Sequence, residues 1–242
     1  RKEYVRELLS HIKEQSPRQL DMLEAVKGLK GAGALKSMKE ILRGQDRDLI
    51  LFVIESLKNL GTDEADPEIA ALLAKHDDPV IAGKVLEYFH GTFQSAIISI
   101  MDDVLAFDNE QTKLLVLEYM EPFFPDPKER DTDRIAPYIR RLFTDTHACV
   151  RMKAAGILTH ADSPKEREQA RLYMASELED ASAEEVLPLI QTVITDSSDF
   201  IIDQVLAQKE KFSKQTQTEH GLTRRYVEIL SRFPVPRVFD LV

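Results

Sequence analysis

Residues 85–89 read Val-Leu-Glu-Tyr-Phe, and a nearly identical phrase, Val-Leu-Glu-Tyr-Met, returns 31 positions later at residues 116–120. A related segment, Val-Ile-Glu-Ser-Leu at residues 53–57, precedes the first phrase by 32 positions. A period in the thirties that contains two helices is typical of an α-solenoid, in which each helix pair buries its apolar face against its neighbours. The phrase therefore recurs because each repeat buries equivalent apolar positions against its neighbours.

Apolar residues follow helical spacing along nearly the whole chain, whereas the alternation expected of strands is absent. Breaks come every twelve to sixteen residues and carry signals for the start of a helix, at Ser16-Pro17, Asp66-Pro67, Asp78-Pro79, Ser163-Pro164 and Ser182 with Glu185. These breaks predict about fourteen short helices.

We expect an all-α fold, namely a right-handed α-α superhelix of about six or seven helical hairpins in a single domain over residues 1–242. Residues 1–45 are expected to form N-terminal capping helices, residues 46–163 the core repeats, and residues 164–242 divergent C-terminal repeats and a tail. The 51 positions from Asp145 to Asp196 break the repeat period. The C-terminal third is therefore either a set of divergent repeats or a capping bundle.

Composition indicates a folded, helical chain without a membrane span. Of the 242 residues, 43% are hydrophobic, none is Trp and only nine are Gly, which disfavours a β-rich fold and a Gly-rich nucleotide loop. The longest uncharged apolar run is far shorter than a bilayer requires. The single cysteine, Cys149, excludes an internal disulfide and fits a cytoplasmic location. Because the chain begins with Arg1, we expect it to be a segment of a longer polypeptide.

The formal charge of −10 is concentrated in the middle of the chain. Residues 46–204 contain 15 Lys and Arg against 32 Asp and Glu, whereas both ends are slightly basic. An acidic surface repels phosphate backbones, and proteins that bind nucleic acid usually present a basic stripe. Nucleic acid is therefore an unfavourable partner.

The segment Asp-Thr-His-Ala-Cys-Val-Arg-Met-Lys-Ala-Ala-Gly-Ile-Leu, residues 145–158, resembles the second helix of a HEAT repeat. That helix typically opens with Asp, continues with Val-Arg, and then has a small residue and a Leu. Residues 68–89 are a looser match, with Ile81-Ala82 in place of Val-Arg. The resemblance implies a solenoid used mostly to bind proteins, and it implies that Asp145 and Arg151 brace neighbouring repeats through hydrogen bonds.

Each repeated phrase carries a glutamate at its centre, at Glu55, Glu87 and Glu118. At 100° per residue, Glu87 lies about 200° from both Val85 and Phe89, so it faces outward when those two face the core. Equivalent helices of adjacent repeats stack roughly 8 to 10 Å apart. The three carboxylates are therefore predicted to form a ladder along one face, either as a solvated surface or as a docking stripe for a basic protein segment.

Signs of catalysis are weak in this sequence. No Gly-x-Ser-x-Gly, Walker or His-Glu-x-x-His motif is present. His147 and Cys149 lie two positions apart and diverge on a helix, so they do not make a metal pair by themselves. We therefore expect no catalytic residue, no metal and no cofactor.

The function expected is that of a non-catalytic scaffold, which binds a protein partner or another domain of its own polypeptide. Two alternatives remain open. One is a regulatory solenoid attached to a bacterial membrane transporter, and the other is an enzyme that resembles the HEAT-like DNA glycosylases. The acidic charge and the lack of Trp disfavour the glycosylase, whose family presents a basic, aromatic-lined face.

Overall fold

A computed structural model describes residues 32–89, 95–124, 132–193, 199–213 and 220–231. These residues are mostly helical and contain no strand, which confirms the predicted all-α class for this part of the chain. They form two compact units that divide between Tyr119 and Met120. The superhelix and the single domain stay predictions.

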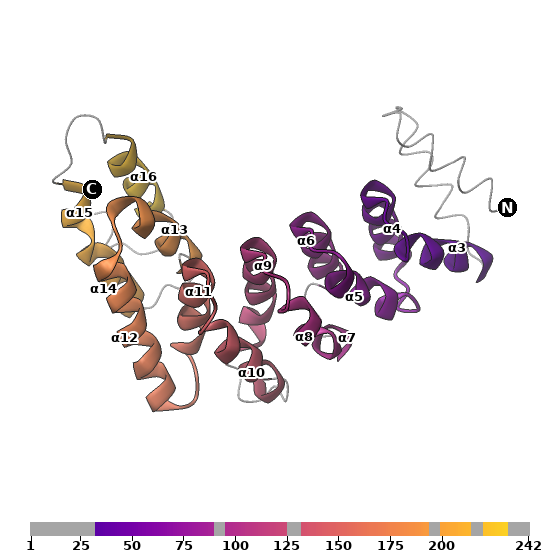
Figure 1. Cartoon of the computed structure of the whole chain (residues 1–242), viewed down its shortest axis with the longest axis horizontal. Helices are drawn as coiled ribbons and strands as arrows, with labels where there is room; N and C mark the ends of the chain where they lie inside the picture. The colour runs from indigo at the N-terminus through magenta and orange to yellow at the C-terminus, as the bar shows by residue number, and fades with distance from the viewer. Residues whose placement is uncertain (1–31, 90–94, 125–131, 194–198, 214–219, 232–242) are drawn as a thin grey trace. The chain divides into compact units, whose positions relative to one another are not determined.

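Unit 1 is a succession of short helices (Figure 1). Its elements are α3 (Ala32–Leu42), α4 (Arg47–Leu60), α5 (Asp66–Lys75), α6 (Pro79–Tyr88), α7 (Ser95–Ser99), α8 (Met101–Val104) and α9 (Glu110–Met120). The last residue of α9 is the first of unit 2. Most of the predicted N-terminal capping segment, including Ser16-Pro17, lies outside the described residues.

Helices of unit 1 pack both on the next helix and on the next but one. Consecutive helices pair as α3 with α4 and α5 with α6, while α3 also packs on α5 and α4 on α6. The apolar positions of the repeated phrases lie in this core: Leu86 is 5% exposed and Leu117 is fully buried. Both leucines are therefore buried, as the helical register predicts.

The ends of these helices are fixed by local side-chain and backbone chemistry. Asp46 accepts a hydrogen bond from Leu49 N, and Asp78 accepts from Val80 N and Ile81 N, so each aspartate caps a helix start. Gly61 ends α4 with φ 62°, a left-handed conformation that a residue without Cβ adopts readily. The predicted start signal at Asp78-Pro79 is confirmed.

Unit 2 contains a short 3-10 helix and seven α-helices among its described residues. They are η1 (Glu121–Phe123), α10 (Thr132–Leu142), α11 (Ala148–Leu158), α12 (Pro164–Asp180), α13 (Ala183–Val193), α14 (Asp199–Ala207), α15 (Lys209–Ser213) and α16 (His220–Leu230). Ser163 caps α12, and Ser182 with Glu185 forms a reciprocal capping box at α13. The predicted tail, which begins at Pro234, lies outside the described residues.

Helix α11 is the centre of unit 2 (Figure 1). It contacts α10, α12 and α13, and its residues 152–159 are buried without interruption. Lys153 lies in this buried run, and its Nζ is 2.8 Å from Glu121 Oε2, so an ion pair ties η1 to α11. A buried ammonium requires such a partner, because desolvating an unpaired charge is costly.

Packing on the next helix but one continues through the C-terminal part of unit 2. Helix α11 packs on α13 and α12 on α14, whereas α13 packs on α16, the third helix after it. The starts of α4, α6 and α9 lie at residues 47, 79 and 110, whereas α11, α13 and α16 start at 148, 183 and 220. The steps between these starts are 32 and 31 residues in unit 1, and 35 and 37 residues in unit 2. The spacing of the helices in unit 2 is therefore longer than the period of the repeated segments in unit 1.

Within the described ranges, no helix is both long enough and apolar enough to cross a membrane.

Candidate interaction surface

The three glutamates of the predicted ladder are exposed on α4, α6 and α9. The side chains of Glu55 and Glu87 are 39% and 53% exposed, and Glu118 is also exposed. Helices α4 and α6 pack against each other, and Leu115 of α9 lies near Gly83 of α6. The helical geometry that placed these glutamates outside the core is therefore correct.

Two lysines neutralise the first two carboxylates of this ladder. Lys84 Nζ lies 2.5 Å from Glu55 Oε2 and 3.1 Å from Glu87 Oε2. Lys58 Nζ lies 2.8 Å from Glu87 Oε1. The four side chains alternate in sign from Glu55 through Lys84 and Glu87 to Lys58, and we call them the ionic network. Its formal charge is zero, so this part of the face is not the acidic stripe that the glutamates alone predict.

Proton affinities follow from this arrangement. The hydrogen bond from Lys58, and then that from Lys84, lowers the pKa of Glu87. Lys84 is affected in the opposite sense, because its hydrogen bond to Glu55 raises the pKa of its ammonium group. All four groups are partly solvated, so their pairing orders the surface and adds little stability.

Sequence reasoning missed the two lysines, although a signal for them exists. Lys58 precedes Glu87 by 29 positions, and Lys84 follows Glu55 by the same interval. A repeat step of 32 places position i+32 beside position i, and i+29 is one helical turn earlier on the neighbouring helix. A lysine 29 positions from a glutamate is therefore within reach of it across the repeat boundary.

Glu118 differs from the other two glutamates. Among the residues that the structure describes, neither a hydrogen bond nor an ion pair reaches its carboxylate, and the side chain is exposed on α9. An exposed carboxylate without a bound cation is available to a basic group from outside.

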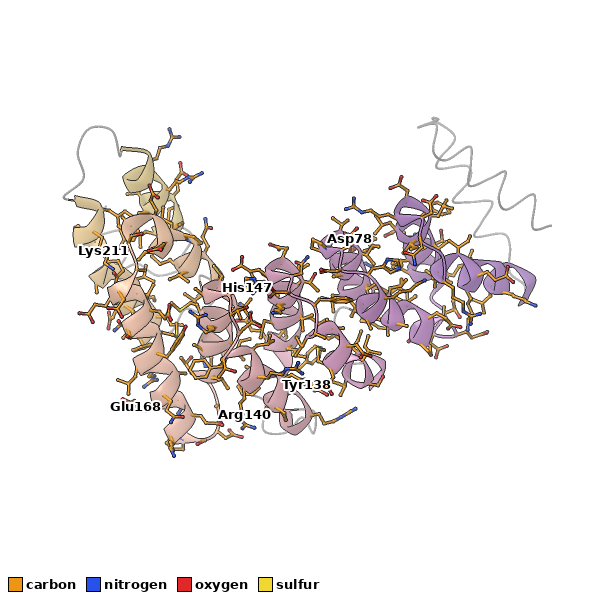
Figure 2. The ribbon with its side chains drawn as sticks, in the orientation of Figure 1. Asp78, Tyr138, Arg140, His147, Glu168 and Lys211 are labelled. Atoms are coloured by element: carbon orange, nitrogen blue, oxygen red, sulfur yellow. The ribbon has the colours of Figure 1, made fainter. Side chains whose placement is uncertain are left out.

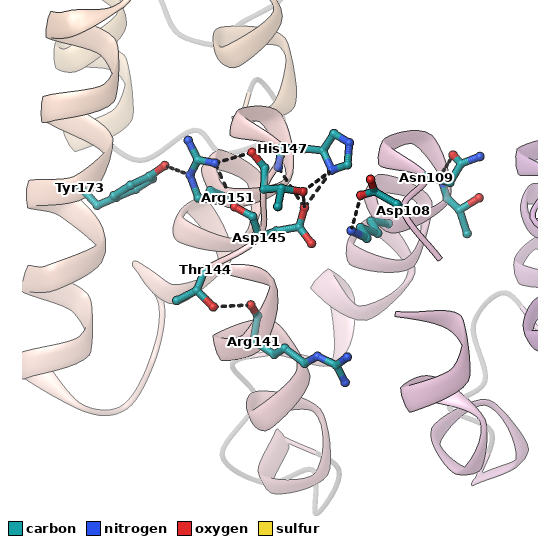
Figure 3. Close-up of polar contacts among 11 residues, drawn as sticks. Asp108, Asn109, Arg141, Thr144, Asp145, His147, Arg151 and Tyr173 are labelled. Atoms are coloured by element: carbon teal, nitrogen blue, oxygen red, sulfur yellow. Dashed lines mark hydrogen bonds and ion pairs between the residues drawn. The ribbon is translucent and has the colours of Figure 1, made fainter. Parts of the chain in front are cut away.

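Arg151 forms a polar junction in unit 2 (Figure 3). Its Nη1 donates to the carbonyl oxygens of Asp145 and Thr146 at 2.9 and 2.8 Å. Its Nε donates to Tyr173 Oη at 2.6 Å, and its Nη2 donates to Glu177 Oε1 at 3.3 Å. One guanidinium thus joins the turn before α11 to the middle of α12, which its planar fork of donors suits.

Tyr173 completes this junction. Its hydroxyl accepts from Arg151 and donates to Glu177 Oε1 at 2.6 Å. Burial, followed by the bond to Glu177, raises the pKa of Tyr173 to about 12, so the hydroxyl keeps its proton at neutral pH. No sequence pattern indicated a role for Tyr173 or Glu177.

Asp145 acts mainly within its own turn (Figure 3). Its Oδ1 accepts from the backbone N of His147 at 3.0 Å and lies 2.9 Å from His147 Nδ1. Its carbonyl oxygen, rather than its carboxylate, is what meets Arg151. The bracing role of Asp145 and Arg151 stays a prediction, and these contacts give it a definite geometry.

A groove of about 720 Å³ lies in unit 2 beside the end of α12, and no sequence pattern predicted it. Its wall includes the small side chains of Ala175, Ala183 and Ala207 and the polar side chain of Gln204. Lys211 also lines it and donates to the carbonyl oxygens of Leu178, Glu179 and Ala181 at 2.5, 2.7 and 2.7 Å. Lys211, labelled in Figure 2, thus caps the carboxyl end of α12, where a cation is favoured.

Comparisons of the chain with protein-family models, with curated proteins and with solved structures find no match. The resemblance to HEAT repeats therefore stays a prediction.

Proposed function

We propose that this chain is a non-catalytic, cytoplasmic HEAT-like scaffold that binds another protein or another domain of its own polypeptide. The observation that carries the proposal is the packing of several helices on the next but one, as in α4 with α6 and α11 with α13. Stacked hairpins of this kind expose one row of helices as an extended face, which α-solenoids use for binding. A right-handed superhelix is part of the proposal.

The outer face of α4, α6 and α9 is the proposed docking surface, and a basic protein segment is the proposed partner. Glu118 offers an exposed carboxylate, whereas Glu55 and Glu87 are already bound to lysines of the ionic network. A basic side chain therefore meets Glu118 without competition. At Glu55 and Glu87 it must displace Lys84 or Lys58, so these two contribute less than Glu118.

The test compares two variants of equal charge. One is Glu55→Gln/Glu87→Gln/Glu118→Gln, and its matched control is Asp103→Asn/Glu168→Gln/Asp203→Asn, which changes three exposed acids elsewhere. Each protein is used to capture partners from cell lysate, and the protein captured by the wild type is then purified. Titrations of this purified protein at two salt concentrations give the binding constants.

We expect the triple Gln variant to bind about tenfold more weakly and with a flatter salt dependence, since each exposed ion pair is worth roughly 0 to 1 kcal/mol. The control should bind like the wild type. Lys84→Met should strengthen binding, because it frees the Glu55 carboxylate and leaves Glu87 paired with Lys58 alone. Equal binding by the wild type and the triple Gln variant, or retention of nucleic acid alone, would contradict the docking surface.

A further inference from the structure

The hydroxyl of Tyr88 lies between two oxygen atoms that normally only accept hydrogen bonds. Tyr88 Oη is 2.8 Å from the carbonyl oxygen of Thr62 and 2.8 Å from Asp66 Oδ1. Tyr88 is the last residue of α6, while Thr62 lies in the loop between α4 and α5 and Asp66 is the first residue of α5. The hydroxyl therefore connects α6 to the start of the preceding helix.

The number of protons decides how this contact works. A tyrosine hydroxyl has one proton and can donate only one hydrogen bond. If Asp66 is ionised, both neighbours are acceptors, and one of the two 2.8 Å contacts has no proton between its oxygens. If Asp66 is neutral, its carboxyl donates to Tyr88 Oη, and Tyr88 donates to Thr62 O. Only the neutral form satisfies both contacts.

The surroundings of Asp66 also disfavour its negative charge. Burial is the largest effect and raises the pKa of Asp66, and the nearby Asp63 raises it further. A hydrogen bond donated by Tyr88 to the carboxylate would oppose both effects. The position of Asp66 at the N-terminus of α5 favours the ionised form and also opposes them.

Charged groups on the helices packed against α5 are bound elsewhere or exposed. Lys39 on α3, and Arg43 directly after this helix, form ion pairs with Glu68. The described helix α7 has no titratable residue, and the two acids of α8, Asp102 and Asp103, are exposed. On α6, Lys84 and Glu87 belong to the ionic network. No cation among these groups is paired with Asp66.

We propose that the neutral carboxyl of Asp66 donates its proton to Tyr88 Oη, and thereby acts as a pH-sensitive fastener between α6 and the start of α5. When Asp66 loses this proton, Tyr88 still donates to Thr62 O, and the hydrogen bond between Asp66 and Tyr88 is lost. The start of α5 is then held less firmly to α6. This device is independent of the docking surface proposed above.

The sign of the pH dependence follows from the raised pKa. A group whose pKa is higher in the folded than in the unfolded chain adds stability that is complete below the unfolded value, about 3.9 for Asp. That contribution is lost as the pH rises through the folded value. Unit 1 should therefore lose stability on the alkaline side of the Asp66 titration.

The decisive measurement is the titration of the Asp66 carboxyl carbon by NMR in the full chain, in the wild type and in Tyr88→Phe. If Asp66 donates to Tyr88, removal of the hydroxyl destabilises the neutral acid, and the pKa of Asp66 falls. If Tyr88 instead donates to a carboxylate, removal of the hydroxyl destabilises the ion, and the pKa of Asp66 rises. A rise would overturn the proposal.

Denaturation over the same pH range gives a second test. Asp66→Asn keeps an N–H donor toward Tyr88 at every pH, so the urea midpoint of the wild type should fall relative to that of Asp66→Asn as Asp66 ionises. Asp63→Asn removes the negative charge that repels the Asp66 carboxylate and leaves the Tyr88 hydroxyl in place. This substitution should therefore lower the pKa of Asp66. If the difference in urea midpoint between the wild type and Asp66→Asn is the same at all pH values, the proposed fastener is contradicted. If Asp66→Asn does not fold, the NMR titration of the wild type and Tyr88→Phe is the deciding test.

Discussion

Gly156 of α11 lies so close to Val193 of α13 that a Cβ atom at residue 156 would be 3.2 Å from Val193 Cγ1. At Gly83 of α6, the corresponding atom would meet Leu115 Cδ1 at 3.8 Å, an ordinary van der Waals distance. The contact between α11 and α13 thus depends on a glycine, whereas the contact between α6 and α9 does not.

This difference predicts opposite effects for the same substitution. Gly83→Ala should stabilise the protein by up to about 1 kcal/mol, because alanine favours a helix. Gly156→Ala should destabilise it by about 1 to 3 kcal/mol, because Val193 is buried and β-branched and cannot rotate away freely. Urea denaturation of both variants measures the two values. Equal stabilisation by both would show that α13 moves to accept the methyl group.

The buried leucines of the repeated phrase should be costly to truncate. Leu86→Ala and Leu117→Ala should each lower the free energy of unfolding by about 2 to 5 kcal/mol, since each leaves a cavity in the core. Leu172→Ala is the matched control, because Leu172 is 63% exposed and its truncation should change stability by less than about 0.5 kcal/mol. Similar unfolding midpoints for all three variants would mean that the register of α6 and α9 is wrong.

Two buried threonines differ in whether their hydroxyl has a partner. Among the residues that the structure describes, Thr112 Oγ1 has no hydrogen-bond partner, whereas Thr159 Oγ1 donates to Gly156 O at 2.7 Å. Thr112→Val removes an unsatisfied hydroxyl and should stabilise the protein by about 1 kcal/mol. Thr159→Val should destabilise it by a similar amount. Thermal and chemical denaturation of the two variants show whether each substitution stabilises or destabilises the protein. Destabilisation by Thr112→Val would indicate that the hydroxyl of Thr112 has a partner after all.

Lys211 should stabilise α12 through the three carbonyl oxygens that it binds. Lys211→Met keeps most of the side-chain length but removes the ammonium, and we expect a loss of about 1.5 to 3 kcal/mol, the range for hydrogen bonds to charged groups. Lys165→Met, at an exposed position in the first turn of α12, is the control and should have little effect. Hydrogen exchange of the backbone amides shows whether the stability is lost at the end of α12. Unchanged protection there in Lys211→Met would refute this role.

The sequence predicted which side chains are buried and which are exposed from the geometry of each helix taken by itself. The period of 3.6 residues fixes which positions share a face, so the burial of Leu86 and Leu117 and the exposure of Glu87 and Glu118 followed from their spacing. Helix starts are equally local, because a side chain two or three residues before an amide caps it. For this reason Asp78 and Ser163 were identifiable as caps.

The sequence by itself therefore determined the helical class, the helix starts and the inward faces, all of which depend on residues a few positions apart. Only the tertiary structure decided which charges meet: Lys84 with Glu55, Arg151 with Tyr173, and Lys211 with the end of α12. These contacts join residues more than twenty positions apart, and they depend on the offset at which neighbouring helices stack. That offset is set by the summed packing of many side chains, so no single segment encodes it.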